Sequence, residues 1–346
     1  MTSRCSICAG LLALSTVAGA TSVHAAPPPT RIGHLVNKPQ LSERDRNEIR
    51  EYAEFWADQL AGTALPAEID KARAKLADPM RAVRVGDIFR LEYARSVVPI
   101  LAKAVDNAPP HAAVNAMHVV GLLGTPASLE IILSHTSVDD EDEYSIRLVA
   151  ARTFPVAVRQ NVLHANDIDR ALRHLGNAAS QEPESLILRR QFEAIASVDS
   201  PLSRDVQVKV LAAAMKSMKE QPGPSEIMEA AYTALMIIRN QYLGLPPADK
   251  ETLGKSLAPV LCDLCMVAAA HWDSAQEDEV ARTSYGGAVL VSEYFLKLID
   301  AQVRPQQSRP KTELGPAWRD REKVRFDTDH ARWRTLLERP PYNKSP

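Results

Sequence analysis

Apolar residues recur along this 346-residue chain at the spacing of amphipathic helices, and proline-containing breaks interrupt them at short, regular intervals. Strand signals are nearly absent, because the sequence has no Asn-Gly or Asp-Gly hairpin turn and no sustained alternation of apolar and polar residues. This pattern predicts an all-α fold. The main breaks are Pro109-Pro110, Gly124-Thr125-Pro126, Pro183, Ser200-Pro201, Pro222-Gly223-Pro224 and Pro246-Pro247.

The spacing of these breaks predicts how the helices are organised. Two helices fit between alternate breaks, which gives units of about 35–45 residues, a period typical of stacked repeats. A helix pair of this size buries only one of its sides, so neighbouring pairs must complete each other's core. We therefore expect an α-solenoid, a superhelix built from antiparallel helix pairs.

Individual helices can be placed from their caps and apolar faces. Ser42, with Asp45 three residues later, forms a capping pattern that opens a helix, which we expect to end before Gly62. Four further helices carry an apolar face that we expect to be buried. These faces are Ile88-Leu91-Ala94-Val98-Leu101-Val105, Ala113-Met117-Val120-Leu123, Ile227-Ala230-Ala231-Ala234-Leu235-Ile238 and Ala288-Val291-Phe295-Leu298-Ile299.

One stretch resembles a known repeat. The residues from Val120 to Pro126 end one helix and start the next, an acidic turn follows at 139–143, and Ser145-Ile146-Arg147-Leu148-Val149-Ala150-Ala151-Arg152 opens another helix. This order is similar to the HEAT-like repeat, with its Leu-Gly-x-Pro break, acidic turn and "(V/I)R-x-x-A-A" helix. The similarity covers Ala116 to Phe154, and elsewhere only helix pairs are recognisable. It implies a HEAT/armadillo-like solenoid, and it implies no single function, because such repeats serve many.

The first 26 residues follow the pattern of a secretory signal peptide. Arg4 supplies a positive charge, residues 7–20 are apolar and uncharged, and three prolines follow at 27–29. The apolar stretch is about half the length that a membrane-spanning helix needs. We expect cleavage after Ala25 or Ala26 and export to the periplasm or the medium.

The rest of the chain divides into three parts by composition. Residues 27–41 form a proline-containing linker, residues 42–300 the helical-repeat domain, and residues 301–346 a basic, proline-containing C-terminal tail with one short helix. No later segment is expected to span a membrane, because the best candidate, 257–270, contains a proline and an aspartate. The exported product is therefore expected to be soluble.

Two cysteines remain after cleavage, Cys262 and Cys265. They lie inside an apolar helical stripe, not at the start of a helix as in thioredoxin-like sites. Side chains three residues apart on a helix are about 5–6 Å apart at Cβ, too far for an unstrained disulfide. Two buried thiols are our main interpretation, and a disulfide at a distorted turn is the alternative. Zinc would need further ligands, and only His271 lies near in sequence.

The C-terminal tail differs in charge from the rest of the chain. Residues 303–346 contain 11 basic and 6 acidic side chains, whereas the whole chain has a formal net charge of −2. Its aromatic residues favour docking over pure disorder. Three alternatives stay open: a solvated tail with one helix near 329–338, a tail packed on the last helices, and a tail that docks onto an acidic partner or an anionic envelope surface. The aromatic residues are Trp318, Phe326, Trp333 and Tyr342.

No motif specifies a reaction. Some HEAT-like proteins are iron-dependent hydroxylases with His-Glu dipeptides as ligands, but no histidine here precedes a glutamate. Phycobilin lyases are also relatives of the repeat, and export argues against that activity. Gly254-Lys255-Ser256 copies the end of a nucleotide-binding loop but lacks the earlier glycine. We name no catalytic, cofactor-binding or metal-binding residue, and we expect no cofactor.

Two groups of residues were weighed as metal sites. His111 and His118 lie two turns apart on one expected helix, with no carboxylate at ligand spacing. The run Asp139-Asp140-Glu141-Asp142-Glu143 lacks the glycine and distal glutamate of a calcium-binding EF-hand loop. We expect this run to be a solvated turn whose acids lie near the N-terminus of the next helix.

These observations favour a non-enzymatic protein of the cell envelope that binds other proteins through its repeats. One alternative is an enzyme or small-molecule-binding protein whose site is assembled from distant residues. Another is a peripheral protein held to the lipid surface by residues 303–346. The near-neutral charge argues against nucleic-acid binding.

Overall fold

The computed structural model describes residues 28–221, 223–307 and 310–343. Within these residues the chain forms α-helices and two short 3₁₀ helices, with no strand, which confirms the all-α class. The signal peptide that we predict lies outside the described residues. The α-helices are α1 Glu43–Gly62, α2 Pro66–Ala77, α3 Asp87–Asn107, α4 Pro110–Leu123, α5 Pro126–Ser134, α6 Tyr144–Val158, α7 Ala165–Gln181, α8 Ser185–Ala196, α9 Pro201–Glu220, α10 Ile227–Gly244, α11 Pro247–Ala270, α12 Trp272–Glu277, α13 Glu279–Val303, α14 Leu314–Arg319 and α15 Lys323–Leu337.

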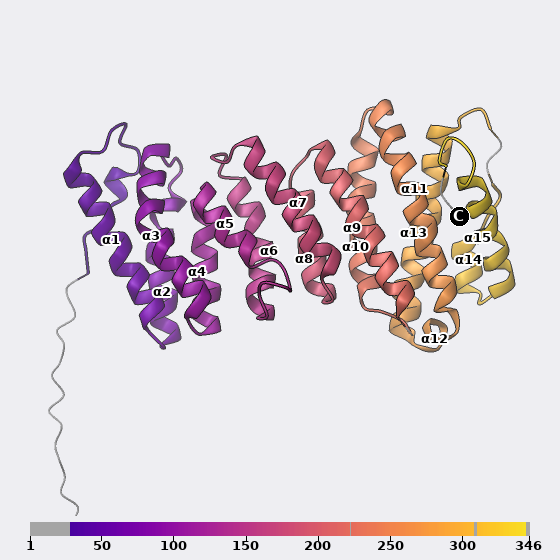
Figure 1. Cartoon of the computed structure of the whole chain (residues 1–346), viewed down its shortest axis with the longest axis horizontal. Coiled ribbons are helices and arrows are strands. Elements are labelled where there is room, and N and C mark those ends of the chain that lie inside the picture. The colour runs from indigo at the N-terminus through magenta and orange to yellow at the C-terminus, as the bar shows by residue number, and fades with distance from the viewer. Residues whose placement is uncertain (1–27, 222, 308–309, 344–346) are drawn as a thin grey trace, which may run out of the picture.

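The helices follow one another along the long axis of the molecule in the order of the sequence (Figure 1). Most helices pack against their neighbours in sequence, and most also pack against the helix two positions later. One series of such contacts runs through α1, α3, α5, α7, α9 and α11, and the other through α2, α4, α6, α8, α10 and α13. Contacts between distant parts of the sequence are therefore confined to neighbouring layers.

Local sequence signals place the helix ends. Ser42 caps α1 in a reciprocal arrangement with Asp45, as the sequence predicts, and the helix includes Gly62 instead of ending before it. The break after α4 uses Gly124 in the left-handed conformation, with φ of 61°. A Cβ atom at Gly124 would lie 2.4 Å from Cβ of Gln160, so glycine is required by both conformation and space.

The apolar faces form a continuous core, with one correction to the sequence analysis. In α3, Ile88 and Leu91 are about half exposed, whereas Phe89, Tyr93 and Val97 are fully buried. The buried face is therefore rotated from the expected one, because the two large aromatic side chains bury more apolar area than the aliphatic pair. The expected faces of α4 and α10 are buried throughout.

Helix α11 is long and apolar enough to cross a membrane by length and composition alone, which the sequence analysis did not expect. In the fold, 61% of its most apolar window is buried, and it packs against α9, α13 and α15. Most of the apolar side chains of α11 therefore pack in the core of the molecule. Gly254 belongs to this packing, since a Cβ atom there would lie 2.8 Å from Cγ2 of Ile299 on α13.

The C-terminal residues described, up to 343, pack on the preceding helices. Helix α14 contacts α13, and α15 contacts α11 and α14. The helix expected near 329–338 begins earlier, at Lys323, and ends at Leu337. Of the three alternatives for the tail, its described residues therefore adopt the one in which the tail packs on the last helices. Its four aromatic side chains, Trp318, Phe326, Trp333 and Tyr342, are all buried.

Candidate binding cleft

The cysteine pair lies in the core and offers no open reaction site. Cys262 and Cys265 are both buried in the middle of α11. Cys262 Sγ lies 3.5 Å from His330 Nε2 on α15, and this nitrogen also lies 3.2 Å from the Cys262 carbonyl oxygen. The contact joins two helices whose residues are 68 positions apart. We interpret it as a packing contact between α11 and α15.

The three histidines weighed as ligands are dispersed. His271 is buried at the end of α11, where its ring nitrogens contact the Tyr285 hydroxyl and the Gln221 carbonyl oxygen. His111 and His118 lie on α4, and desolvation followed by the charges of Arg73 and Arg152 lowers the pKa of His118. In the part of the chain that the structure describes, no group of three or more His, Cys, Asp or Glu side chains is arranged to hold a metal ion.

The acidic run 139–143 is a turn between α5 and α6 that the surrounding side chains hold in place. Arg147 is 4% exposed and donates hydrogen bonds to the carbonyl oxygens of Glu141 and Asp142 at 2.8 and 3.1 Å. The same guanidinium pairs with buried Glu182 at 3.3 Å. Glu143 caps α6, as expected for an acid at a helix N-terminus. This set of contacts, which we call the Arg147 junction, joins three successive helices.

The Gly254-Lys255-Ser256 sequence lies inside α11 and not in a loop. Its backbone amides are therefore used in helical hydrogen bonds, and the resemblance to a phosphate-binding loop has no structural counterpart.

An open cleft of about 1040 Å³ lies at the C-terminal end of the molecule. Its walls are α13, the segment 310–313 and the first turns of α15. The lining is dominated by charged side chains, and most of them are basic. The charged residues are Lys297, Lys311, Arg321, Lys323, Arg325 and Arg332 against Glu313, Glu322 and Asp329.

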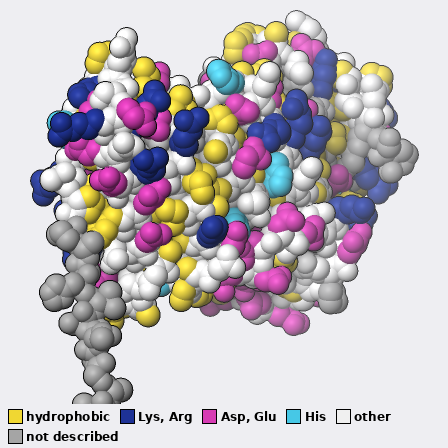
Figure 2. Space-filling view, turned by 60° about the vertical axis from the view of Figure 1, so that its left-hand side comes forward, with side chains coloured by type: hydrophobic (Ala, Val, Ile, Leu, Met, Phe, Trp, Pro, Cys, Tyr) yellow, Lys and Arg dark blue, Asp and Glu magenta, His cyan; other side chains and the backbone are white. Residues whose placement is uncertain are grey.

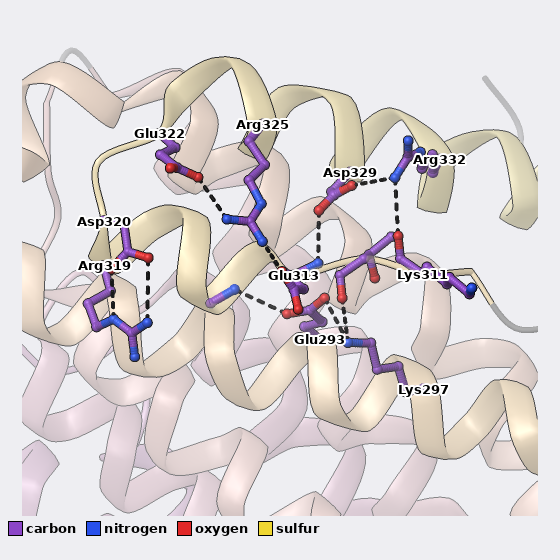
Figure 3. Close-up of polar contacts among 12 residues, drawn as sticks. Glu293, Lys297, Lys311, Glu313, Arg319, Asp320, Glu322, Arg325, Asp329 and Arg332 are labelled. Atoms are coloured by element: carbon purple, nitrogen blue, oxygen red, sulfur yellow. Dashed lines mark hydrogen bonds and ion pairs between the residues drawn. The ribbon is translucent and has the colours of Figure 1, made fainter.

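Buried carboxylates hold one wall of this cleft by its main chain (Figure 3). Asp329, 5% exposed, accepts a hydrogen bond from the amide of Glu313 at 2.8 Å. Glu293, 3% exposed, accepts one from the amide of Gly315 at 3.1 Å. Both carboxylates are therefore occupied in positioning the segment that joins α13 to α14.

Basic side chains complete this support by donating to the carbonyl oxygens of the same segment. Lys297 Nζ donates to the Thr312 oxygen at 2.6 Å, and Arg332 donates to the Lys311 oxygen at 3.1 Å. The Trp333 indole donates to the Thr312 hydroxyl at 2.9 Å. We call these three contacts, together with the two from the carboxylates, the C-terminal brace.

The charges around Asp329 act in opposite directions. Desolvation raises the pKa of Asp329 and is the largest effect, Arg332 lowers it, and the nearby Glu293 raises it further. Arg332 also pairs with Asp329 at 2.8 Å, and Lys297 pairs with Glu293 at 3.0 Å. Each buried carboxylate thus has a basic partner at the cleft wall.

The remaining ion pairs leave part of the basic charge uncompensated. Arg325 lies between Glu313 and Glu322, and Lys323 pairs with Asp273 of α12 at 3.2 Å. Among the described residues, no carboxylate forms an ion pair with Lys311 or Arg321. In Figure 3 the Lys311 side chain extends away from the carboxylates. These two cations are available at the rim.

An aromatic cluster joins α12, α14 and α15, and α15 also lines the cleft. Trp272 of α12 packs edge-on against Trp318 of α14, with ring centroids 4.8 Å apart, and Phe326 of α15 packs against both. Trp318 also donates from its indole to the carbonyl oxygen of Arg282 at 3.1 Å. A Cβ atom at Gly286 would lie 2.8 Å from the Trp318 ring, so the absence of a side chain at this position leaves room for the indole.

A second cleft has nearly balanced charge. The cleft between α1 and α3, of about 500 Å³, is lined by Arg46, Arg50 and Arg95 together with four acids. The face in Figure 2 shows both signs of charge interspersed with hydrophobic side chains. The C-terminal cleft therefore differs from this surface in its excess of basic groups. The four acids of the smaller cleft are Glu43, Glu54, Asp58 and Glu92.

The sequence analysis named no site residue, and only one of its signals pointed to this cleft. That signal is the basic composition of residues 303–346, which supplies five of the six cations that line it. The role of Glu293 had no signal, because it lies 22 residues before Gly315 on an apolar helix. Comparison of the chain with protein-family models, curated proteins and solved structures finds no match.

Proposed function

We propose that this chain is an exported, non-enzymatic protein that binds other proteins in the cell envelope, built as an α-solenoid of HEAT-like antiparallel helix pairs. The observation that carries the proposal is the succession of contacts between most helices and the helix two positions later. Stacked pairs of this kind give a long surface whose area grows with the number of repeats, and such surfaces suit protein recognition. Export is supported by the signal-peptide pattern of the first 26 residues.

The chemistry of the C-terminal cleft favours binding over catalysis. Catalytic carboxylates need access to the reacting atoms, but Asp329 and Glu293 each accept a main-chain amide and are at most 5% exposed. Lys311 and Arg321 remain accessible and attract anionic groups. The two more exposed carboxylates of the lining, Glu313 and Glu322, are both paired with Arg325.

The proposal is tested by purifying the protein from its own host after expression with its native N-terminus. We expect the first residue of the exported protein to be Ala26 or Pro27, and a protein partner to remain bound in a fixed ratio through gel filtration with light scattering. The partner would be identified by mass spectrometry.

Two results would overturn the proposal. The first is retention of the complete N-terminus on a protein that stays in the cytoplasm. The second is a chain that elutes alone from envelope extracts after mild chemical cross-linking, at every salt concentration tried.

A further inference from the structure

We infer that the C-terminal cleft binds an extended acidic segment of a partner protein, with two carboxylates separated by about four residues and an apolar residue between them. This inference rests on the proposed function and names the class of partner that this site would recognise. It is carried by the cleft geometry and by the distribution of charge that remains after the internal ion pairs are formed.

The available charge lies at the two ends of the cleft. Lys311 is beside Arg332, because the Arg332 guanidinium contacts the Lys311 carbonyl oxygen at 3.1 Å. Arg321 comes just before α15, two residues ahead of Lys323. In the middle of the cleft, Arg325 forms ion pairs with Glu313 and Glu322. An incoming anion therefore meets uncompensated charge at the ends and neutralised charge at the centre.

The length of the helix sets the spacing of the partner's charges. From Lys323 to Arg332 the α15 axis advances about 14 Å at 1.5 Å per residue. An extended chain covers this distance in about four residues at 3.3 Å each. Carboxylates at the first and fifth positions of a peptide would thus reach the two cationic ends.

The centre of the cleft favours an apolar side chain. Val324 lines the cleft and is 82% exposed, and Thr328 lies one turn further along the same helix face. The Thr328 hydroxyl already donates to the Val324 carbonyl oxygen, so this part of the surface has little hydrogen-bonding demand. Covering Val324 by a partner side chain would remove exposed apolar area from water.

A peptide fits this site better than other anions. Because Glu313 and Glu322 neutralise Arg325, the centre of the lining offers no net positive charge to the closely spaced phosphates of a nucleic-acid strand or to a continuous layer of anionic lipid headgroups. Glu313 and Glu322 can instead accept hydrogen bonds from the amides of a peptide. The guanidinium of Arg321 can bind one carboxylate through two parallel hydrogen bonds.

The test uses the full-length exported protein and fluorescein-labelled peptides in anisotropy titrations. The probe contains Glu-Ser-Leu-Ser-Glu between glycine-serine flanks. One comparison peptide replaces both glutamates by glutamine, and a second, Glu-Glu-Leu-Ser-Ser, keeps the charge but changes the spacing. We expect the probe to bind about tenfold or more tightly than either comparison peptide, with affinity that falls as salt rises.

Charge-reversal variants assign the binding to the cleft. Lys311→Glu with Arg321→Glu is expected to weaken probe binding about tenfold or more, since both ends lose their cation. The matched control, Lys103→Glu with Lys216→Glu, makes the same charge change at exposed lysines of α3 and α9. It should leave binding within about twofold, because these lysines lie on other helices and only screened long-range charge changes. Circular dichroism melting would show that both variants are folded.

Several outcomes would overturn the inference. One is equal affinity for the correctly spaced and the mis-spaced acidic peptide. Another is equal loss of binding in the two double variants. Binding of phosphatidylglycerol vesicles or single-stranded DNA that exceeds peptide binding and depends on Lys311 and Arg321 would assign the cleft to those ligands instead.

The failure of this inference can be distinguished from the failure of the proposed function. A host protein that remains bound in a fixed ratio to the Lys311→Glu/Arg321→Glu variant would support a protein-binding function and exclude the cleft as its site. A chain that binds the probe but is retained in the cytoplasm would support the cleft and exclude the envelope function.

Discussion

The Arg147 junction and the C-terminal brace both contain buried carboxylates with basic partners, but the basic partners are exposed to different degrees in the two regions. At the junction, one guanidinium that is 4% exposed satisfies Glu182 and two carbonyl oxygens, so all of its charge is used inside the fold. At the brace, two buried carboxylates hold main-chain amides, and their basic partners reach the open cleft. The junction has a helix on either side, whereas the brace lies on the last helices of the chain.

This difference shows how position in the stack affects what charges can do. Between layers, a charged group must be fully paired, because the next helix excludes water from it. At the C-terminal end, no further helix of the described residues covers α15, so side chains there can remain partly unpaired and solvated. Unpaired charged groups for binding a partner therefore lower the free energy of unfolding least when they lie on the last helices.

The largest expected effect is at the junction. Arg147→Ala leaves Glu182 buried without its partner and two carbonyl oxygens without a donor, so we expect a loss of about 3–5 kcal/mol in the free energy of unfolding. Urea denaturation followed by circular dichroism measures it. The control is Arg170→Ala, which removes the exposed pair with Glu130 and should cost less than about 1 kcal/mol. Equal losses in the two variants would remove the distinction between layer and surface.

A smaller effect is expected at the brace. Asp329→Asn keeps the shape of the side chain but replaces one of the two oxygens that accept from the Glu313 amide and from Arg332 by an NH2 group, so we expect a loss of about 1–2 kcal/mol. Hydrogen exchange should show faster exchange at the amides of the segment 310–315, with no change around α6. Faster exchange at α6 as well would mean that the brace and the Arg147 junction are coupled.

The raised pKa of Asp329 gives this substitution a pH dependence. Because desolvation keeps the proton on Asp329 to higher pH in the folded state than in the unfolded state, its contribution to stability falls as pH rises from about 4 through the folded pKa. The Asn variant cannot titrate, so its stability deficit should be larger at pH 4 than at pH 7. A deficit that grows with rising pH would contradict this assignment.

The N-terminal cap of α1 should respond to acid with the opposite sign. A hydrogen bond from Lys38, followed by those from Ser42, lowers the pKa of Asp45 to about 2. Its contribution is present above the unfolded pKa of about 4 and is lost as pH falls towards about 2. Asp45→Asn should therefore be less stable than the parent at pH 6, with the gap closing at pH 2. Thermal melts at the two pH values test this, and a constant gap would contradict it.

The smallest change in stability is expected at the cleft rim. Lys311→Glu with Arg321→Glu should alter the free energy of unfolding by less than about 0.5 kcal/mol, because neither side chain forms an ion pair with the described residues. Urea denaturation measures it beside the Arg147 variant. A large loss would show that these cations support the brace and are not reserved for a partner.

Much of the fold could be predicted from the sequence, and little of the candidate site. The Ser42 cap, the break at Gly124 and the buried face of α4 follow from residues within one or two turns of each other. The start of the buried face of α3 was predicted wrongly, because the periodic pattern placed Ile88 and Leu91 on that face in place of Phe89 and Tyr93. The cleft was visible only as an excess of basic residues in the tail.

By itself, the sequence determined the helical class and most helix boundaries, because helical hydrogen bonds, caps and proline breaks act over about four residues. Only the tertiary structure decided that Arg147 meets Glu182 across 35 positions and that Glu293 and Asp329 hold the same short segment from two helices. Such partners depend on the angle and register at which helices pack. Many weak apolar contacts set that register jointly, and no local pattern records it.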